Sequence, residues 1–391
     1  MKRDHLLFFA ILIAVAFPAL PGLGSPENIS ALLLLLVILS SGLSSVYVAG
    51  FAYTMLAISG LIFISTIAGL LLVEGDYSFN PSALGPYVRL VICFQALQRA
   101  EDPAKMHRWL LWLGAGASLF ALLQFLSPDI VASFTSAHYL ARERSSVFTE
   151  DFSGNSIVRV IGFFENPSSV ALLSISFILL SIRAFSVGQI KGGVLAIFLI
   201  LHFMAGVFSL SKVFFIGLPL VFLQLILFRY RLAVFLSFLI LITSTALILS
   251  SSLDQMQVIR YAFESAFTPS VALHNRYLEE VLEVLKRSWF FGYGLVAPQN
   301  IIINDSLYLE FGFLVGLFGF LVMTGFLLSW LWRWRRRIMA TLYLIGAIVL
   351  IAGIGSNSIF GFRVEIFLTA ACSFLFVQIH SSGRRSAWTA C

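Results

Sequence analysis

Charged residues are scarce in this chain of 391 residues. Asp, Glu, Lys and Arg together make up 11%, whereas soluble domains carry about a quarter. Hydrophobic residues reach 59%, and the mean hydropathy is +0.96. So little charge excludes an ordinary water-soluble domain. The apolar runs approach the roughly 20 residues that a membrane-crossing helix needs and do not alternate as barrel strands do, so we expect an integral membrane protein built as a helical bundle.

Cysteine and the common catalytic motifs are also sparse. Cys93, Cys372 and Cys391 are scattered without metal-ligand spacing, which argues against a disulfide framework and a zinc site. We find no glycine-rich nucleotide loop, no DxD-like metal pair and no nucleophile elbow. We therefore expect no metal and no cofactor, so that the energy for any chemistry comes with the substrate. The net charge of +6 indicates basic cytoplasmic loops, and no nucleic-acid partner is expected.

Twelve apolar segments predict an all-α, polytopic bundle that forms a single integral membrane domain over residues 1–391. The fourth segment is the weakest, because it contains Arg89 and a charge at mid-bilayer costs at least about 2.5 kcal/mol. The basic N-terminal segment is interpreted as an uncleaved first helix rather than a signal peptide. The predicted spans are 6–22, 29–44, 50–73, 83–98, 109–127, 168–186, 193–210, 213–228, 232–251, 308–331, 338–356 and 363–380.

The distribution of lysine and arginine predicts the orientation of the bundle. If the spans alternate, the basic loops fall on one side, which the positive-inside rule assigns to the cytoplasm together with both termini. Two long loops, 128–167 and 252–306, then face outward, and connections of this length are usually functional or disordered. The second contains a predicted amphipathic helix over 273–287. The basic loops are Arg99–Arg108, Arg183–Lys191, Arg229–Arg231, Trp332–Arg337 and Arg384–Arg385.

The basic residues predicted to face outward include Arg159, Lys212, Arg260, Arg276 and Arg363. If the helix ends converge, these side chains form a basic pocket at the outer surface that suits a diphosphate. The alternative is that each anchors a helix end by reaching to lipid headgroups. Arg159 and Arg276 favour the pocket, because each lies within an apolar or structured stretch and the guanidinium fork matches phosphate.

The candidate acids among the outward residues are Glu150, Asp151, Glu165, Asp305 and Glu310. A carboxylate beside arginines at a membrane entrance can act as a general base, orient an arginine or lie on a solvated surface. His138 and His274, also in the outer loops, are further candidate acid–base groups.

Two polar features belong to the sixth and seventh spans. Asn166 and Pro167 are expected to start the sixth helix, because asparagine caps free N–H groups and proline fits the first helical position. His202 inside the seventh span is expected to form a hydrogen bond with a neighbouring helix.

Four segments carry a resemblance to a known family. They are Arg159–Ser168 (RVIGFFENPS), Leu210–Lys212 (LSK), Asn275–Arg276 with Ser288–Gly294 (SWFFGYG), and Asn304–Tyr308 (NDSLY) with Gly312 and Gly316. In this order they resemble the R-x-x-G-x-F-x-N-P-N, Ser-Arg, R-x-x-x-W…P-x-x-G-x-G and HN or D-S-x-Y motifs of the O-antigen ligase and polymerase superfamily, the Wzy-type membrane glycosyltransferases. Two departures stand out: Lys212 replaces an arginine, and the proline before Gly-x-Gly is absent.

The resemblance implies a glycosyltransferase of the bacterial inner membrane with a periplasmic active site. Lipid-linked repeat units on undecaprenyl diphosphate would be donor and acceptor, in contact with membrane lipid and with a chain-length regulator and a flippase as further partners. Arg159, Lys212 and Arg276 would stabilise the departing diphosphate, and Asp305 or Glu165 would take the acceptor's proton. Substrate contacts would come from Asn166, Ser211, Arg260, Tyr308 and Arg363.

Three functions stay open at this point. Asp305 stands where ligases of the family have histidine, which favours a polymerase that makes O-antigen, capsule or exopolysaccharide. The first alternative is a ligase that transfers finished glycan to a lipid A core or to protein. The second is a transporter or flippase of lipid-linked glycan, although charges in such proteins gather near the bilayer midplane rather than at one face.

Overall fold

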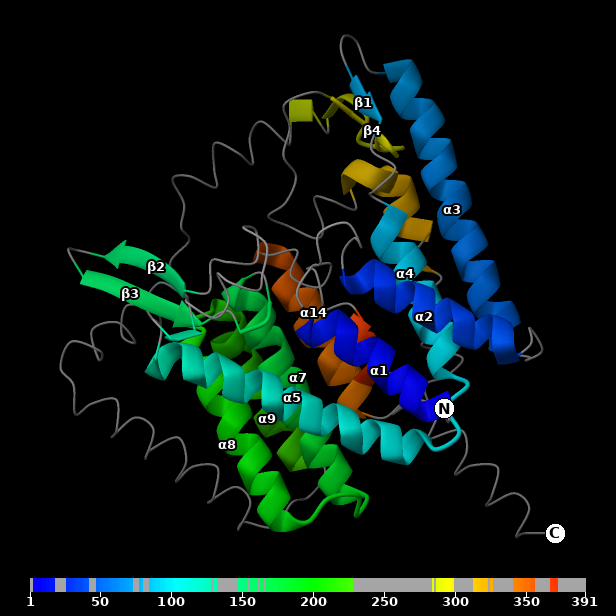
Figure 1. Cartoon of the computed structure of the whole chain (residues 1–391). Coiled ribbons are helices and arrows are strands. Elements are labelled where there is room, and N and C mark those ends of the chain that lie inside the picture. Colours follow the sequence, from blue (N-terminus) through cyan, green and yellow to red (C-terminus); the bar gives the residue numbers. More distant parts are fainter. Residues whose placement is uncertain are drawn as a thin grey trace.

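The fold is mostly helical (Figure 1), with helix over 84% of the residues that can be interpreted. Among these residues, two helices are long and apolar enough to cross a membrane, which supports a helical membrane protein. Twelve crossings and the layout of the outer loops stay predictions. The computed structural model describes residues 3–17, 26–41, 47–72, 77–79, 84–127, 130–131, 147–152, 155–160, 162–164, 166–227, 283–284, 286–298, 312–322, 324–325, 340–355 and 366–371.

Helices make up most of the described chain, and two short two-stranded sheets accompany them. The helices are α1 (Arg3–Ala16), α2 (Pro26–Ser41), α3 (Tyr47–Leu72), α4 (Gly85–Leu97), α5 (Pro103–Leu126), α7 (Pro167–Ser186), α8 (Gly192–Phe208), α9 (Lys212–Leu227) and α14 (Ala340–Gly355). A shorter apolar helix is Gly312–Val322. The strands are β1 (Tyr77–Phe79), β2 (Val147–Phe152), β3 (Asn155–Val160) and β4 (Val296–Pro298).

The helix boundaries follow from local capping signals. The Asn166 side chain accepts a hydrogen bond from the Ser169 N–H (2.8 Å), and Pro167 takes the first helical position, which confirms the predicted start of α7. Helix α5 begins at Pro103 rather than near 109, because Asp102 caps it through the Lys105 N–H (2.9 Å). The polar first turn therefore belongs to the helix.

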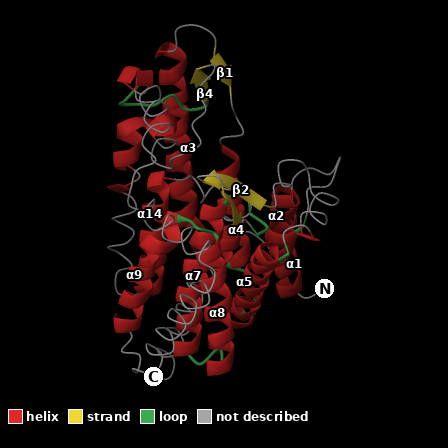
Figure 2. Ribbon diagram, turned by 90° about the vertical axis from the view of Figure 1, so that its left-hand side faces the viewer, coloured by secondary structure: helices red, strands yellow, loops and turns green. Residues whose placement is uncertain are grey.

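Strands were not part of the predicted all-helical fold. Strands β2 and β3 form an antiparallel hairpin within the first long loop, with Phe152 opposite Asn155, so only two residues connect them. Short β-branched and aromatic stretches joined by a two-residue, glycine-containing connection are a typical hairpin pattern. Strands β1 and β4 pair beside one end of α3, as Figures 1 and 2 both show.

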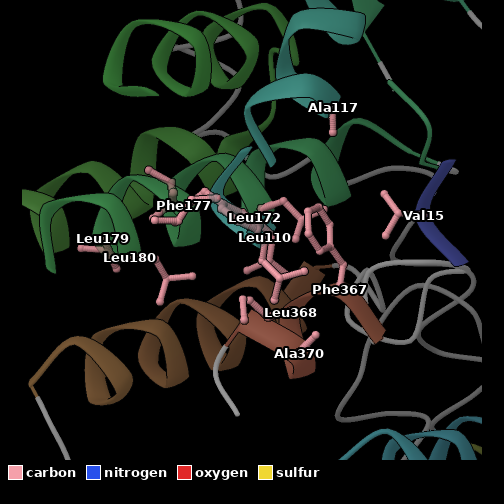
Figure 3. Packing of buried hydrophobic residues seen from close by; sticks show 14 of the residues in the cluster. Val15, Leu110, Ala117, Leu172, Phe177, Leu179, Leu180, Phe367, Leu368 and Ala370 are labelled. Carbon is pink, nitrogen blue, oxygen red and sulfur yellow. The ribbon is translucent and has the colours of Figure 1, made fainter. Parts of the chain in front are cut away.

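Helix α7 lies at the centre of the main core. It contacts α5, α8, α9 and α14, and most of its residues are buried. The ring centroids of Phe177 of α7 and Phe367 lie 4.8 Å apart, and Figure 3 shows these two residues among the other buried hydrophobic side chains of the core. A Cβ atom on Gly114 of α5 would lie 2.6 Å from the Phe177 ring, so α5 can approach α7 this closely only with glycine there. Small residues allow this kind of packing between membrane helices.

Side-chain hydrogen bonds fix the relative directions of the helices. At one end of the bundle, His107 near the start of α5 bonds to Gln189 after α7 (3.0 Å). At the other end, Gln124 near the end of α5 bonds to Gly162 just before α7. Helices α5 and α7 are therefore antiparallel, as alternating spans require.

One end of the bundle gathers positive charge, and we call it the basic end. Asp4 of α1 lies there, because its carboxylate accepts the N–H groups of Glu101 (2.7 Å) and Asp102 (3.0 Å). Arg3 donates a hydrogen bond to the Arg99 carbonyl, and burial, with Arg3 beside it, lowers the pKa of Arg99. The basic residues at this end are Arg3, Arg99, Lys105, Arg108, Arg183 and Lys191.

A second, smaller cluster joins the segment 288–296 to α3 and to Gly312–Val322. Gly292 and Gly316 both have positive φ (74° and 61°), and their backbones face each other so closely that a Cβ on either would overlap the other chain segment. The Tyr293 N–H donates to the Phe313 carbonyl (2.6 Å). The Tyr293 hydroxyl donates to the Val284 carbonyl (2.7 Å), and burial raises the pKa of this tyrosine, with Arg287 acting in the opposite direction.

Candidate functional site

The candidate site lies at the end of the bundle opposite the basic end, where α7 and α9 begin. Asn166 closes the first turn of α7, since its side-chain oxygen accepts from both the Ser169 N–H (2.8 Å) and the Ser169 hydroxyl (3.1 Å). Pro167 has no N–H, so the Ser168 N–H is the remaining donor of this first turn without a partner within the helix. The start of α7 therefore offers this donor and a positive helix-dipole end.

A tight turn between α8 and α9 carries the second element of the site. Leu210 adopts a left-handed backbone conformation (φ 49°), and the Ser209 hydroxyl donates to the Gly206 carbonyl (2.6 Å). Gly206 permits this turn, because any larger residue would overlap the Phe214 ring. Helix α9 starts directly afterwards at Lys212, so a lysine occupies its first position.

The two helix starts touch. The Ser211 hydroxyl donates to the Ser168 hydroxyl (3.3 Å), which joins residues 43 positions apart in the sequence. Both side chains are small, so the backbones of the two first turns come close together. Two positive helix ends that converge in this way attract an anion more strongly than either alone.

Strand β3 leads into the same region. It contacts α5, α7 and α8, and Arg159 lies in it opposite Phe148 of β2. Between β3 and α7 the chain turns at Gly162 (φ 60°). The buried Gln124 side chain holds this turn: its oxygen accepts the Gly162 N–H (2.7 Å), and its NH2 group donates to the Gly162 carbonyl (3.0 Å).

The backbones of four predicted site residues therefore lie at one end of the bundle. These residues are Arg159, Asn166, Ser211 and Lys212. The structure describes the side chains of Asn166 and Ser211, and for Arg159 and Lys212 it describes the backbone. Predicted residues that lie outside the described parts of the chain are Glu165, Arg260, Arg276, Asp305, Tyr308 and Arg363. Their roles stay predictions, as does the boundary of each outer loop.

The amphipathic helix predicted over 273–287 is described only at its end. Residues 283–284 and 286–287 are helical, and the rest of this prediction lies outside the described residues.

Sequence reasoning missed Gln124, which positions the site without belonging to a motif, and gave no role to Ser168, the last residue of the Arg159–Ser168 segment. A glutamine in the last turn of an apolar span is a signal that could have been used, because a buried amide must find partners. The prediction for His202 is confirmed, since its ring forms a hydrogen bond with Ser118 of α5 (2.7 Å). Among the described residues, no group of three or more His, Cys, Asp or Glu side chains lies together.

The arrangement can bind an anion at the surface of the bundle. The Ser168 N–H, two helix dipoles, a lysine at the first position of α9 and an arginine in the adjoining strand are all suited to phosphate oxygens. No protein-family model, curated protein or solved structure matches this chain.

Proposed function

We propose that the protein is a membrane glycosyltransferase that polymerises oligosaccharide repeat units carried on undecaprenyl diphosphate. The observation that carries the proposal is the contact between the starts of α7 and α9, with Ser211 bonded to Ser168. It brings the backbones of Asn166 and Lys212 together at an end of the bundle that β3, with Arg159, also reaches. A diphosphate attached to a membrane lipid is an anion that can reach this end of the bundle from the bilayer.

The proposed reaction needs the two substrates and side chains of the protein, and no metal or cofactor. A hydroxyl of the acceptor sugar attacks the anomeric carbon of the donor, a new C–O glycosidic bond forms, and the bond from that carbon to the diphosphate oxygen breaks. The electron pair stays on the diphosphate, where Lys212, Arg159 and the two helix ends stabilise the growing negative charge. A carboxylate, Asp305 or Glu165, takes the proton of the hydroxyl.

The proposed orientation places the basic end in the cytoplasm. Arg99, Lys105, Arg183 and Lys191 lie at that end, as the positive-inside rule requires of a bacterial inner-membrane protein. The α7–α9 site then opens to the periplasm, where lipid-linked repeat units are available for elongation.

Purified protein in detergent tests the proposal with a synthetic undecaprenyl-diphosphate-linked repeat unit as the substrate. The wild-type protein is expected to give a ladder of products on the carrier lipid. Lys212→Ala is expected to lower the elongation rate by about 10²–10³-fold, the usual cost of losing one group that stabilises charge in the transition state. Lys212→Arg keeps the charge and retains activity, and Lys191→Ala at the basic end serves as the matched control.

Arg276→Ala is expected to abolish polymer while the protein stays in the membrane at normal amounts. Polymer of normal length from both Arg276→Ala and Lys212→Ala would refute the assignment. Transfer of single repeats or finished glycan to a different acceptor would identify a ligase instead. Elongation by detergent-solubilised protein, which has no second compartment, would exclude a transporter.

A further inference from the structure

An open groove lies on the outside of the bundle at the basic end, far from the α7–α9 site. It has a volume of about 710 Å3, within the roughly 300–1,000 Å3 of pockets that bury small ligands. Its walls come from the first turns of α1 and from the second and third turns of α5. The lining residues are His5, Phe8, Phe9, Trp109, Trp112 and Leu113.

The walls of this groove are aromatic and held in place by neighbours. The His5 ring stacks on Trp109 with centroids 5.4 Å apart and an interplanar angle of 17°. Phe8 packs against the same indole at 5.1 Å. Trp112 is 53% exposed on the groove side, while its edge meets Phe198 of α8 at 4.8 Å. The groove therefore keeps its shape without an occupant, and its exposed surface is apolar.

Positive charge borders one end of the groove. The Lys105 ammonium lies 4.6 Å from the centroid of Trp109, and Arg108 is exposed one turn before Trp112. Of the nearby acids, Asp4 accepts the N–H groups of Glu101 and Asp102 just before α5, and Asp102 caps α5 through the Lys105 N–H. Glu101 and Asp102 are the exposed acids of the turn before α5, whereas Lys105 and Arg108 follow on the helix, near Trp109 and Trp112.

The groove also lies at the depth of the lipid headgroups. Helix α5 has 24 residues and is about 36 Å long, which exceeds the roughly 30 Å of the hydrocarbon layer. Its first turn with Lys105 therefore reaches the headgroup region, Trp109 lies near the boundary where aromatic side chains are favoured, and Trp112 lies deeper, within the hydrocarbon layer. A phosphate near Lys105 and Arg108 places an attached acyl chain along Trp112 and Phe9.

We propose that this groove binds one phospholipid with an anionic headgroup. The phosphodiester lies between Lys105 and Arg108, and an acyl chain occupies the aromatic channel between α1 and α5. The lipid joins the first and fifth helices at the basic end and takes no part in the proposed glycosyl transfer. A zwitterionic phospholipid fills the same channel less well, because its ammonium group meets the two cations.

Native mass spectrometry of the full chain in detergent tests this inference, with dioleoyl phosphatidylglycerol and dioleoyl phosphatidylcholine as the two probes. Wild-type protein is expected to retain one phosphatidylglycerol in preference to phosphatidylcholine. The double variant Lys105→Gln/Arg108→Gln is expected to weaken phosphatidylglycerol binding at least about tenfold and to leave phosphatidylcholine binding unchanged. Lys191→Gln, which removes a charge at the same end outside the groove, is the matched control.

A second pair of variants tests the channel itself. Trp112→Leu keeps an apolar contact with Phe198 and is expected to weaken the binding of both lipids, whereas Leu123→Ala on the exposed side of α5 leaves both unchanged. Equal retention of the two lipids by wild-type protein, or unchanged phosphatidylglycerol binding in the double variant, would overturn the proposal. So would a co-purified peptide occupying the groove in place of lipid.

Discussion

Replacing Gln124 with methionine tests whether the site depends on one buried amide. Gln124 is 0% exposed and satisfies both backbone groups of Gly162, at 2.7 Å and 3.0 Å. Methionine fills a similar volume but can neither donate nor accept these bonds. The variant therefore leaves a buried N–H and a buried carbonyl without partners, each of which costs about 1–3 kcal/mol.

The expected loss for Gln124→Met is about 2–6 kcal/mol in the free energy of unfolding, the sum of the two unpaired groups. Because Gly162 lies between β3 and the start of α7, we also expect elongation to fall even where the protein stays folded. The Gly162 turn fixes how Arg159 and Asn166 approach each other along the chain. Stability and activity should therefore fall together.

Unfolding in mixed micelles gives the free energy, and the elongation assay gives the rate. Gln224→Met is the matched control, because Gln224 is equally buried but makes its bond to Leu179, within α7 rather than in the turn before it (2.9 Å). The control is expected to lose less stability and to retain the elongation rate. A Gln124→Met variant within about 0.5 kcal/mol of wild type would show that the Gly162 turn holds without the amide.

Three further predictions use the same unfolding assay. Asp4→Ala is expected to lower the free energy of unfolding by about 2–4 kcal/mol, because two N–H groups lose a charged acceptor. Asp4→Asn is expected to lower it by about half as much, and equal stability of the two variants would contradict this. Gly316→Ala is expected to cost more than about 2 kcal/mol through its positive φ and the overlap with Gly292, whereas Gly346→Ala in open space on α14 should be neutral or stabilising. The pKa of Tyr293 is raised in the folded protein. Its contribution to the free energy of unfolding is therefore complete below pH 10.0, the ordinary tyrosine pKa, and is lost as the pH rises further. Tyr293→Phe should therefore remove part of the alkaline loss of stability, and identical alkaline profiles would count against it.

The helices could be predicted from the sequence because the signals that mark their ends are local. The start of α7 was predicted correctly because Asn166 and Pro167 carry the whole capping signal within two residues. The start of α5 was placed too late because hydropathy treats a charged first turn as loop, although Asp102 and Pro103 form the same kind of cap. The β2–β3 hairpin was missed because its strands lie in a polar stretch that was interpreted as a loop without secondary structure.

The candidate site was harder to predict from the sequence, because its geometry depends on long-range contacts. No periodic pattern relates Ser168 to Ser211, and their contact follows only from the way α7 packs against α8 and α9. The role of Gln124 could not be predicted for a similar reason. Its partner is the backbone of Gly162, which any residue type could supply. Motif order along the chain suggested the region, and the packing of the helices gave its shape.

The hydrogen bonds of Asp4 carry a consequence for biogenesis. Its two backbone partners lie 97 and 98 residues later in the chain, so a ribosome that adds about 5–20 residues per second needs about 5–20 s to reach them. During this interval the Asp4 carboxylate lacks its two native N–H donors and stays in contact with water at the membrane surface. Helix α1 therefore reaches its final place only after the start of α5 has been synthesised.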